Sequence, residues 1–278
     1  MPKLSDNVRR KLELKWKNQV PFNTMVSRVN IYSDVYQACL THALSTEKEE
    51  VMGLLIGQHV NTQTGLEAML HALMLLRRSD KRRDRVEISA EQQAEASTYA
   101  EELAPVDGQP LRVCGWYHSH PHITVHPSHV DVNTQANYQA MDPHFVGLIF
   151  SVFSNESSNA KKPSKIEVKC FQAERGTNGP VGVEVTLNLI SRKLSPSYPC
   201  LRALLSLPKI LYEEEKEAYD MSEEIAGPLD PLTQLNNCAV FSKALCGITE
   251  VVGGPLVDVF EATLNSAQKD LKEIHEAL

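Results

Sequence analysis

The sequence predicts a mixed α/β domain over residues 29–192, followed by a helical extension over residues 193–278. Two observations carry this prediction. Apolar runs typical of strands alternate with helical patterns as far as residue 192, whereas only helical patterns follow Pro199. Residues 1–28 are basic and weakly amphipathic, so we interpret them as an N-terminal arm outside the folded domain.

Hydrophobic patterning assigns the elements of the α/β domain in order. A helical face at residues 35–43 precedes the apolar run at residues 51–57, which ends in glycine and predicts a buried strand. Further strands are predicted at residues 68–76, 111–117, 145–153, 166–172 and 181–190, with helices at 91–103 and 130–141. The polar segment at residues 154–164 is rich in residues that break regular structure and predicts a loop.

The composition is that of a globular protein. Of 278 residues, 42% are hydrophobic and 23% are charged, and no uncharged apolar run reaches the length of a membrane span. The 28 Lys and Arg residues against 35 Asp and Glu give a net charge of -7, which disfavours a nucleic-acid-binding protein. The six scattered cysteines form no CxxC pair and no apolar leader follows the N-terminus, so we expect a cytoplasmic and nuclear protein with reduced thiols. We expect neither nucleic acid nor a membrane as a partner.

Two charged segments lie outside these patterns. The first contains six cations within nine residues: Arg77, Arg78, Lys81, Arg82, Arg83 and Arg85. Such a run is either a solvated surface or a contact surface, and RNA is the weaker partner because no aromatic residues interleave with the cations. The second segment, residues 213–217, contains four glutamates and is interpreted as the solvated face of a helix.

The C-terminal third carries a stripe of apolar residues. An apolar helical stretch at residues 232–252 is expected to end at the sequence Gly253, Gly254, Pro255. Apolar residues then recur at spacings of three and four: Val257, Phe260, Leu264, Ala267, Leu271, Ile274 and Leu278. This is the a/d stripe of a coiled coil. It packs either on its own domain or on a partner helix, and we favour the partner helix.

Five of the ten histidines fall within twelve residues: His118, His120, His122, His126 and His129. His118 and His120 are two residues apart at the end of a predicted strand, so their imidazoles share one face. With the carboxylate of Asp131, they make a set of three ligands that leaves one position of a tetrahedral zinc ion open to water. We expect the other three histidines to be surface or packing residues. The segment Ser128 to Asp131 also fits a helix capping box.

The same residues resemble a known motif. The sequence GWYHSHP at residues 115–121, with SHVD at residues 128–131, resembles the JAMM motif of MPN-domain metalloproteases. The resemblance implies an MPN (JAMM) fold, a curved and mostly antiparallel sheet flanked by helices and followed by the helical extension. It also implies that His118, His120 and Asp131 hold one catalytic Zn²⁺ with water as the fourth ligand.

The resemblance assigns two further catalytic residues. Glu50 stands where the family has its general base, and Ser128 stands where the family has a hydrogen-bond donor to the oxyanion. On the residue pattern alone, Glu49 is an equal rival of Glu50, because neighbours on a strand face opposite ways and only one can face the metal. The resemblance selects Glu50.

Segments outside the motif, at residues 43–53, 77–81, 84–89 and 145–150, resemble one subfamily. It comprises the lysine-63-linkage-specific deubiquitinase subunits of the BRISC and BRCA-containing complexes. The resemblance implies polyubiquitin as substrate, further complex subunits, and an inactive MPN-like scaffold of the Abraxas family, bound through the MPN domain and the C-terminal helices. It also suggests that the basic run contacts ubiquitin.

Two alternatives to this function stay open. The first is an inactive MPN scaffold, which normally lacks Glu50 or one of the three metal ligands. The second is an enzyme for another modifier, as in the related proteasome-lid and deneddylase subunits.

Overall fold

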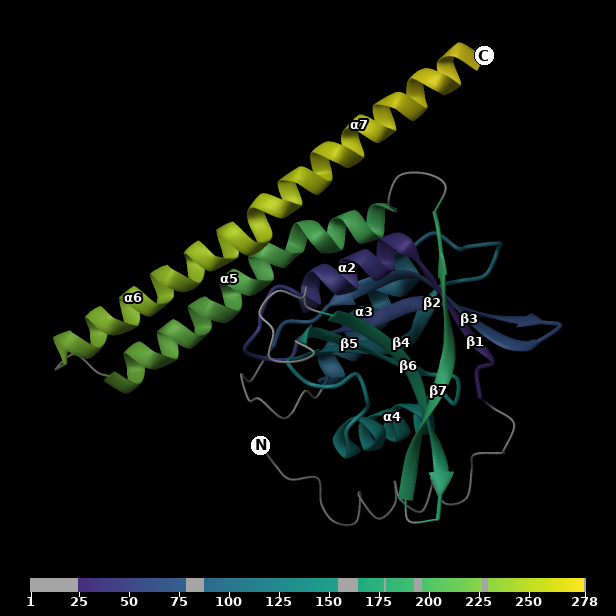
Figure 1. The fold of residues 1–278 in the computed structure, drawn as a ribbon, viewed down its shortest axis with the longest axis horizontal. Helices are drawn as coiled ribbons and strands as arrows, with labels where there is room; N and C mark the ends of the chain where they lie inside the picture. Colours follow the sequence, from purple (N-terminus) through teal and green to yellow (C-terminus); the bar gives the residue numbers. More distant parts are fainter. Residues whose placement is uncertain are drawn as a thin grey trace.

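The computed structural model describes residues 25–78, 88–154, 165–177, 179–192, 197–226 and 230–277. In chain order its elements are β1 Arg28–Tyr32, α2 Ser33–Ala43, β2 Met52–Thr62, β3 Gly65–Leu75, α3 Ala90–Glu102, β4 Arg112–Pro121, α4 His129–Met141, β5 Val146–Ser154, β6 Lys165–Gly176, β7 Gly179–Ile190, α5 Tyr198–Ala226, α6 Pro231–Ile248, a π-helix Thr249–Gly253, and α7 Gly254–Ala277. This order confirms the α/β domain and its helical extension (Figure 1). Most of the predicted arm and all but the first residue of the loop predicted at residues 154–164 lie outside the described residues.

The seven strands close into a barrel in the order β1-β3-β2-β4-β5-β6-β7. Strand β2 is antiparallel to β3 and β4, and β6 is antiparallel to β5 and β7. Strands β4 and β5 are parallel, and β1 is parallel to both β3 and β7. The sheet is therefore curved and mixed. Its closure was not predicted, because β1 has only five residues and its partner on β7 is distant in the sequence.

Alternate side chains of the strands pack into two different cores. Tyr117 of β4 and Leu55 of β2 lie in the larger core, together with residues of α2 and α5. Their neighbours Trp116 and Leu54 lie in a second core, which contains Tyr138 of α4. The period of two along each strand thus gives β4 one side that faces α2 and another that faces α4.

Helix α5 packs against α6, and the chain then continues as one helix through α7 (Figure 1). The predicted break at Gly253 to Pro255 is wrong. The segment Thr249–Gly253 is a π-helix, in which the N–H of Gly254 donates to the carbonyl oxygen of Thr249. Pro255 has no N–H to donate, and the wider turn lets the helix pass it without a break. Val252 and Leu256 are buried here and join the larger core.

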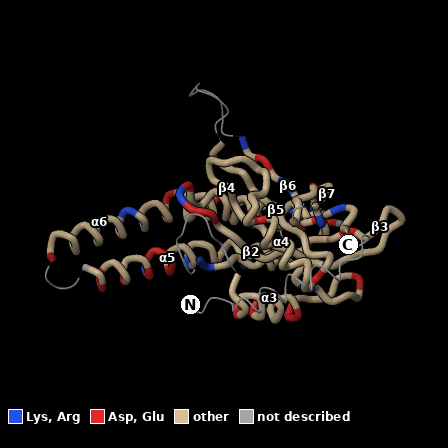
Figure 2. The backbone as a smooth tube through the Cα atoms, turned by 90° about the horizontal axis from the view of Figure 1, so that it is seen from below, with Lys and Arg blue, Asp and Glu red and all other residues tan. Residues whose placement is uncertain are grey.

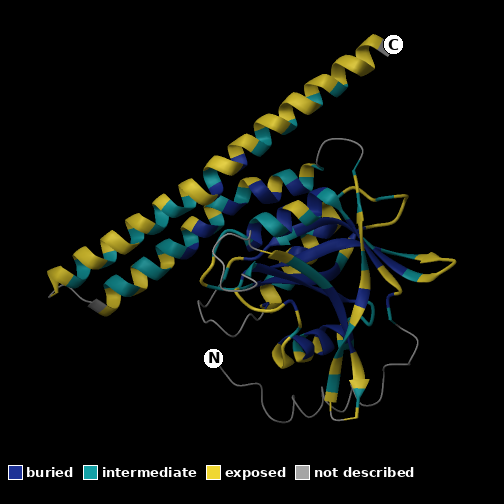
Figure 3. Cartoon of the chain, viewed as in Figure 1, coloured by how far each residue is buried: buried dark blue, intermediate teal, exposed yellow. Residues whose placement is uncertain are grey.

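Most of the predicted stripe on α7 is not packed on its own domain, although Phe260 contacts the larger core. Its residues Val257, Leu264, Leu271 and Ile274 are between 55 and 68% exposed, and the figure shows this face as open (Figure 3). In the part of the chain that is described, one helix, from Pro231 to Glu276, is long and apolar enough to cross a membrane, judged by length and composition alone. A single such helix is weak evidence for a membrane segment.

The structure revises both charged segments. Glu214 is only 3% exposed, so the interpretation of residues 213–217 as a solvated face is wrong at its centre. Glu214 follows Leu211 by three residues and Leu207 by seven, which places it on the buried face of α5. Arg77 and Arg78 form ion pairs with α5, so these two cations are engaged within the chain. The other four cations of the run lie outside the described residues.

Candidate metal centre

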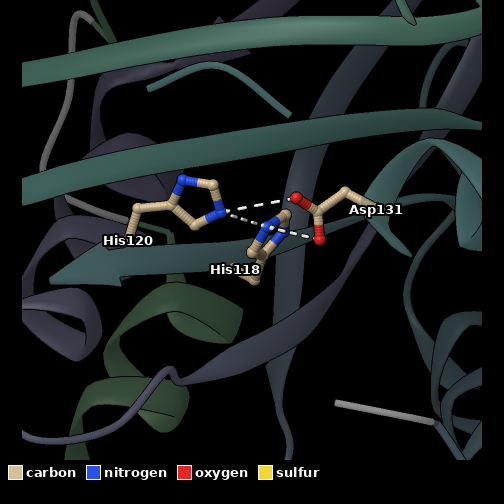
Figure 4. A group of neighbouring side chains, drawn as sticks. All are labelled: His118, His120 and Asp131. Carbon is tan, nitrogen blue, oxygen red and sulfur yellow. Dashed lines mark hydrogen bonds and ion pairs between the residues drawn. The ribbon is translucent and has the colours of Figure 1, made fainter. Parts of the chain in front are cut away.

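Strand β4 brings His118 and His120 together. Their side chains are 1% and 3% exposed, and their Nε2 atoms lie 3.0 Å apart (Figure 4). Ser119, between them, is turned toward the segment before β2, where its N–H donates to the carbonyl oxygen of Val51 and its Oγ accepts from the N–H of Val51, each at 2.9 Å. The predicted pairing of the two imidazoles on one face of a strand is confirmed.

Helix α4 supplies the carboxylate from its first turn. Ser128 is the N-cap: its Oγ accepts from the N–H of Asp131 at 3.2 Å, and its own N–H donates to Asp131 Oδ2 at 2.6 Å. This is the predicted capping box. The same carboxylate reaches both histidines, with Oδ1 at 3.4 Å from His118 Nε2 and Oδ2 at 3.5 Å from His120 Nε2.

The spacing of these three side chains fits a tetrahedral metal ion. At Zn–N and Zn–O lengths of about 2.0 to 2.1 Å, neighbouring ligand atoms of a tetrahedron are about 3.3 to 3.4 Å apart. The two Nε2 atoms are 3.0 Å apart, and the nearest Asp131 oxygen lies 3.4 Å from His118 Nε2 (Oδ1) and 3.5 Å from His120 Nε2 (Oδ2), each within a few tenths of an ångström of that edge. Within the described residues, these three form the group of His, Cys, Asp and Glu side chains that could hold a metal ion.

A hydrogen bond behind His120 and a ring stack beside His118 set the orientation of the two imidazoles. His120 Nδ1 donates to the carbonyl oxygen of Thr124 at 2.7 Å, which leaves the lone pair on Nε2, the atom that faces Asp131. The ring of His118 is stacked on Trp116, with centroids 4.6 Å apart and planes 12° from parallel. Trp116 Nε1 in turn donates to Gln135 Oε1 at 2.7 Å.

Gln135 is a supporting residue that the sequence analysis missed. It follows Asp131 by four residues and so lies on the same face of α4. Its Nε2 donates to the carbonyl oxygen of Phe145 at 2.7 Å, which ties the helix to the start of β5. The spacing from Asp131 was a usable signal, but the contact with Trp116 depends on how α4 docks on β4.

The electrostatics of the group favour a charged carboxylate beside an imidazole that holds its proton. Burial raises the pKa of Asp131, but hydrogen bonds from His118 and His120 outweigh burial and hold that pKa well below its usual range. Burial lowers the pKa of His120, but Asp131, the Thr124 carbonyl oxygen and the charge of Glu50 raise it above 6.5 overall. A cation between these groups would replace that proton.

The two adjacent glutamates point to different partners. Both precede β2 rather than lying on it, since the strand begins at Met52. Glu49 pairs with Arg78, whereas Glu50 is half-buried and its charge acts on His120. The charge of Glu50 therefore acts on the candidate metal group, whereas Glu49 is paired with Arg78.

The remaining predicted residues lie around this group. His122, His126 and His129 are exposed and contribute no atom to it. Ser128 is exposed at the N-terminus of α4, and because its oxygen accepts the capping hydrogen bond, its hydroxyl proton remains able to donate.

Comparison with known proteins defines the class. Residues 24–144 match the family described as JAB1/Mov34/MPN/PAD-1 ubiquitin protease, and residues 200–278 match the BRCC36 C-terminal helical domain. The chain belongs to the JAB1/Mov34/MPN/PAD-1 ubiquitin protease family.

Its relatives within that family share most of its length. The chain is 46% identical over 251 residues to the Lys-63-specific deubiquitinase BRCC36 of Xenopus tropicalis, covering 90% of this chain and 94% of that one. It is 47% identical over 241 residues to the protein of the same name from Camponotus floridanus, covering 86% and 89%. Among mouse proteins, the Lys-63-specific deubiquitinase BRCC36-like is 44% identical over 277 residues, covering 90% and 93%.

The coupling between Asp131 and His120 predicts a pH dependence. Asp131→Asn removes the charge that raises the pKa of His120, while burial still lowers it. A pKa raised on folding adds stability that is present below the unfolded value of 6.5 and is lost as pH rises through the folded value. In the metal-free chain, the difference in unfolding free energy between wild type and variant should therefore grow from about pH 8 to about pH 6.

Urea unfolding of chelator-treated protein at several pH values measures this difference. Asp258→Asn, on the exposed side of α7, makes the same charge change and should give a difference that does not vary with pH. A constant or shrinking difference for Asp131→Asn would contradict the assigned coupling.

Proposed function

We propose that this chain is a zinc-dependent deubiquitinase that hydrolyses the isopeptide bond between the C-terminal glycine of ubiquitin and a lysine. The observation that carries the proposal is the buried group of His118, His120 and Asp131, on which the charge of Glu50 acts. The choice of lysine-63-linked chains is supported by the relatives' names. These relatives are similar to this chain along most of their length and are named Lys-63-specific deubiquitinases.

The residues of the candidate site have distinct roles in hydrolysis. His118, His120 and Asp131 would hold the zinc ion. Bound zinc would supply Lewis-acid activation of the attacking water at neutral pH. Glu50 takes the proton from the water and delivers it to the leaving lysine amine. The hydroxyl of Ser128 donates to the carbonyl oxygen as negative charge develops on it.

The two alternatives are weaker. An inactive scaffold normally lacks part of this set, whereas Glu50 and Ser128 are present in the sequence and His118, His120 and Asp131 lie together. An enzyme for another modifier is disfavoured because the relatives are named for ubiquitin linkage.

We further propose that the chain acts within a complex. The C-terminal region matches the BRCC36 C-terminal helical domain and leaves its apolar stripe open, which supports a helical partner of the Abraxas-family scaffold type. All six cysteines are unpaired, which supports a cytoplasmic and nuclear location.

Removal of the metal should abolish activity. Chelation should stop cleavage of lysine-63-linked di-ubiquitin and added zinc should restore it, because the attacking water depends on the ion. His118→Ala and Asp131→Ala should lose bound zinc by elemental analysis, whereas His129→Ala, which changes an exposed histidine, should keep it. Full activity in a metal-free chain would exclude this mechanism.

Replacing Glu50 should separate catalysis from metal binding. Glu50→Gln should keep zinc and substrate affinity but lose about 10² to 10⁴ in kcat, since it removes a general base and no ligand. Steady-state kinetics with di-ubiquitin and elemental analysis of the same samples test this. Loss of turnover in Glu49→Gln together with normal turnover in Glu50→Gln would reverse the assignment of the two glutamates.

The stripe on α7 should be needed for assembly and for turnover. The isolated chain should bind zinc but cleave poorly, and the partner should raise turnover. Changing Leu264 and Leu271 together to Asp should abolish the complex and its activity without loss of zinc, because charges cannot enter an a/d seam. The matched control changes Asn265 and Lys272, which lie off the stripe, to Asp. A Leu264 and Leu271 double variant that still assembles, or a monomer as fast as the complex, would refute the proposal.

A further inference from the structure

An ion-pair network, here called the Arg78 bridge, joins Glu49, Arg78 and Glu214. The backbone N–H of Arg78 donates to Glu214 Oε1 at 2.7 Å, and Arg78 Nε donates to Glu214 Oε2 at 2.9 Å. Arg78 Nη2 also contacts Glu214, and Nη1 donates to Glu49 Oε2. One arginine therefore connects the segment before β2 to α5 of the helical extension.

Burial makes the Arg78 bridge a geometric constraint. The side chains of Arg78, Glu214 and Glu49 are 7%, 2% and 22% exposed. Burial lowers the pKa of Arg78, but the hydrogen bond and charge of Glu214 outweigh burial and raise it, so the guanidinium stays charged. Its planar fork accepts only a narrow range of carboxylate positions.

A neighbouring set of ion pairs provides a contrast. Arg77 lies 3.9 Å from Glu213 and 3.4 Å from Glu217, and all three side chains are between 39 and 48% exposed. Pairs this exposed are screened by water and hold their partners loosely. The two ion pairs of Arg77 join the end of β3 to the charged part of α5. Figure 2 shows acidic and basic residues along that helix. Only the buried bridge can hold a backbone in place.

The place of Glu49 in the chain gives this constraint its consequence. Glu49 immediately precedes Glu50, and Val51, which follows, is held by two hydrogen bonds to Ser119, between the two metal-binding histidines. Glu50 therefore lies between two anchors. The anchor at Val51 belongs to the barrel, and the anchor at Glu49 depends on α5.

We propose that Arg78 and Glu214 are positioning residues for Glu50, which act by fixing Glu49 and with it the backbone that carries the general base. This inference rests on the proposed function and deepens it. Helix α5 is then a structural part of the active site, and the position of the helical extension sets the rate of the chemical step without touching the metal or the substrate.

Kinetics of bridge variants test the proposal. The zinc-loaded full chain, in the assembled form that turns over lysine-63-linked di-ubiquitin, should lose about ten- to a hundredfold in kcat for both Glu49→Gln and Glu214→Gln. KM and zinc content should not change. Glu49→Gln leaves the buried pair of Arg78 and Glu214 intact, so it tests the link even where Glu214→Gln weakens folding. Glu217→Gln, on the same helix, is the matched control and should keep the wild-type kcat.

The rate measured in a Glu50→Gln background distinguishes positioning of Glu50 from a general structural effect of the bridge variants. If the bridge acts through Glu50, adding Glu49→Gln to Glu50→Gln should give no further loss of rate. A further loss in that background, or an equal loss in Glu217→Gln, would overturn the proposal. So would normal kcat in both bridge variants while Glu50→Gln is inactive.

A second measurement does not depend on activity. Hydrogen exchange of the peptide that covers residues 44–51 should become faster in Glu214→Gln than in Glu217→Gln, at equal zinc content. Equal exchange in the two variants would overturn the coupling. If the wild-type complex does not cleave di-ubiquitin, the proposed function fails, and this comparison still decides whether α5 holds the segment.

Discussion

The alternation of side chains along β4, a strand bounded on both sides by hydrogen-bonded neighbours, is the constraint on which the rest of the site depends. Trp116, His118 and His120 project toward α4, whereas Tyr117 belongs to the core around α2. Strands β2 and β5 pair with β4 on either side. A shift of β4 by one residue against them would move each of its side chains from one core to the other. The strand therefore brings the two imidazoles together, and the loop after it orients the ring of His120 through the carbonyl oxygen of Thr124.

Helix α4 uses one carboxylate for two purposes. Asp131 closes the capping box with Ser128 and also faces both histidines. The cap fixes where the helix begins, and the beginning of the helix fixes the carboxylate, so local helix chemistry and metal chemistry specify the same position. Gln135 and Trp116 then lock the helix to the strand. The result is a rigid group whose buried charge is balanced before any substrate arrives.

The parts of this arrangement that could be predicted from the sequence are the local ones. The spacing of His118 and His120 and the capping box depend on neighbours within a few residues, and both appear as expected. Closure through β1, the pairing of Glu214 with Arg78 and the hydrogen bond from Trp116 to Gln135 depend on contacts between distant segments, for which a single sequence carries no direct signal. The passage of the helix through Pro255 was missed for another reason: a π-turn follows from tertiary anchoring at Val252 and Leu256 rather than from composition.

That anchoring divides a very long helix into two arms. The helix from Pro231 to Glu276 has 46 residues, which at 1.5 Å per residue is about 70 Å. It is held to the core near Val252 and Leu256, so α6 with its partner α5 lies on one side of a fulcrum and α7 on the other (Figure 1). A tilt of about 5° would move the far end of α7 by about 3 Å. The two arms are about equally long, so a displacement of the exposed end of α7 about this anchor is matched by a displacement of similar size at the far end of α6.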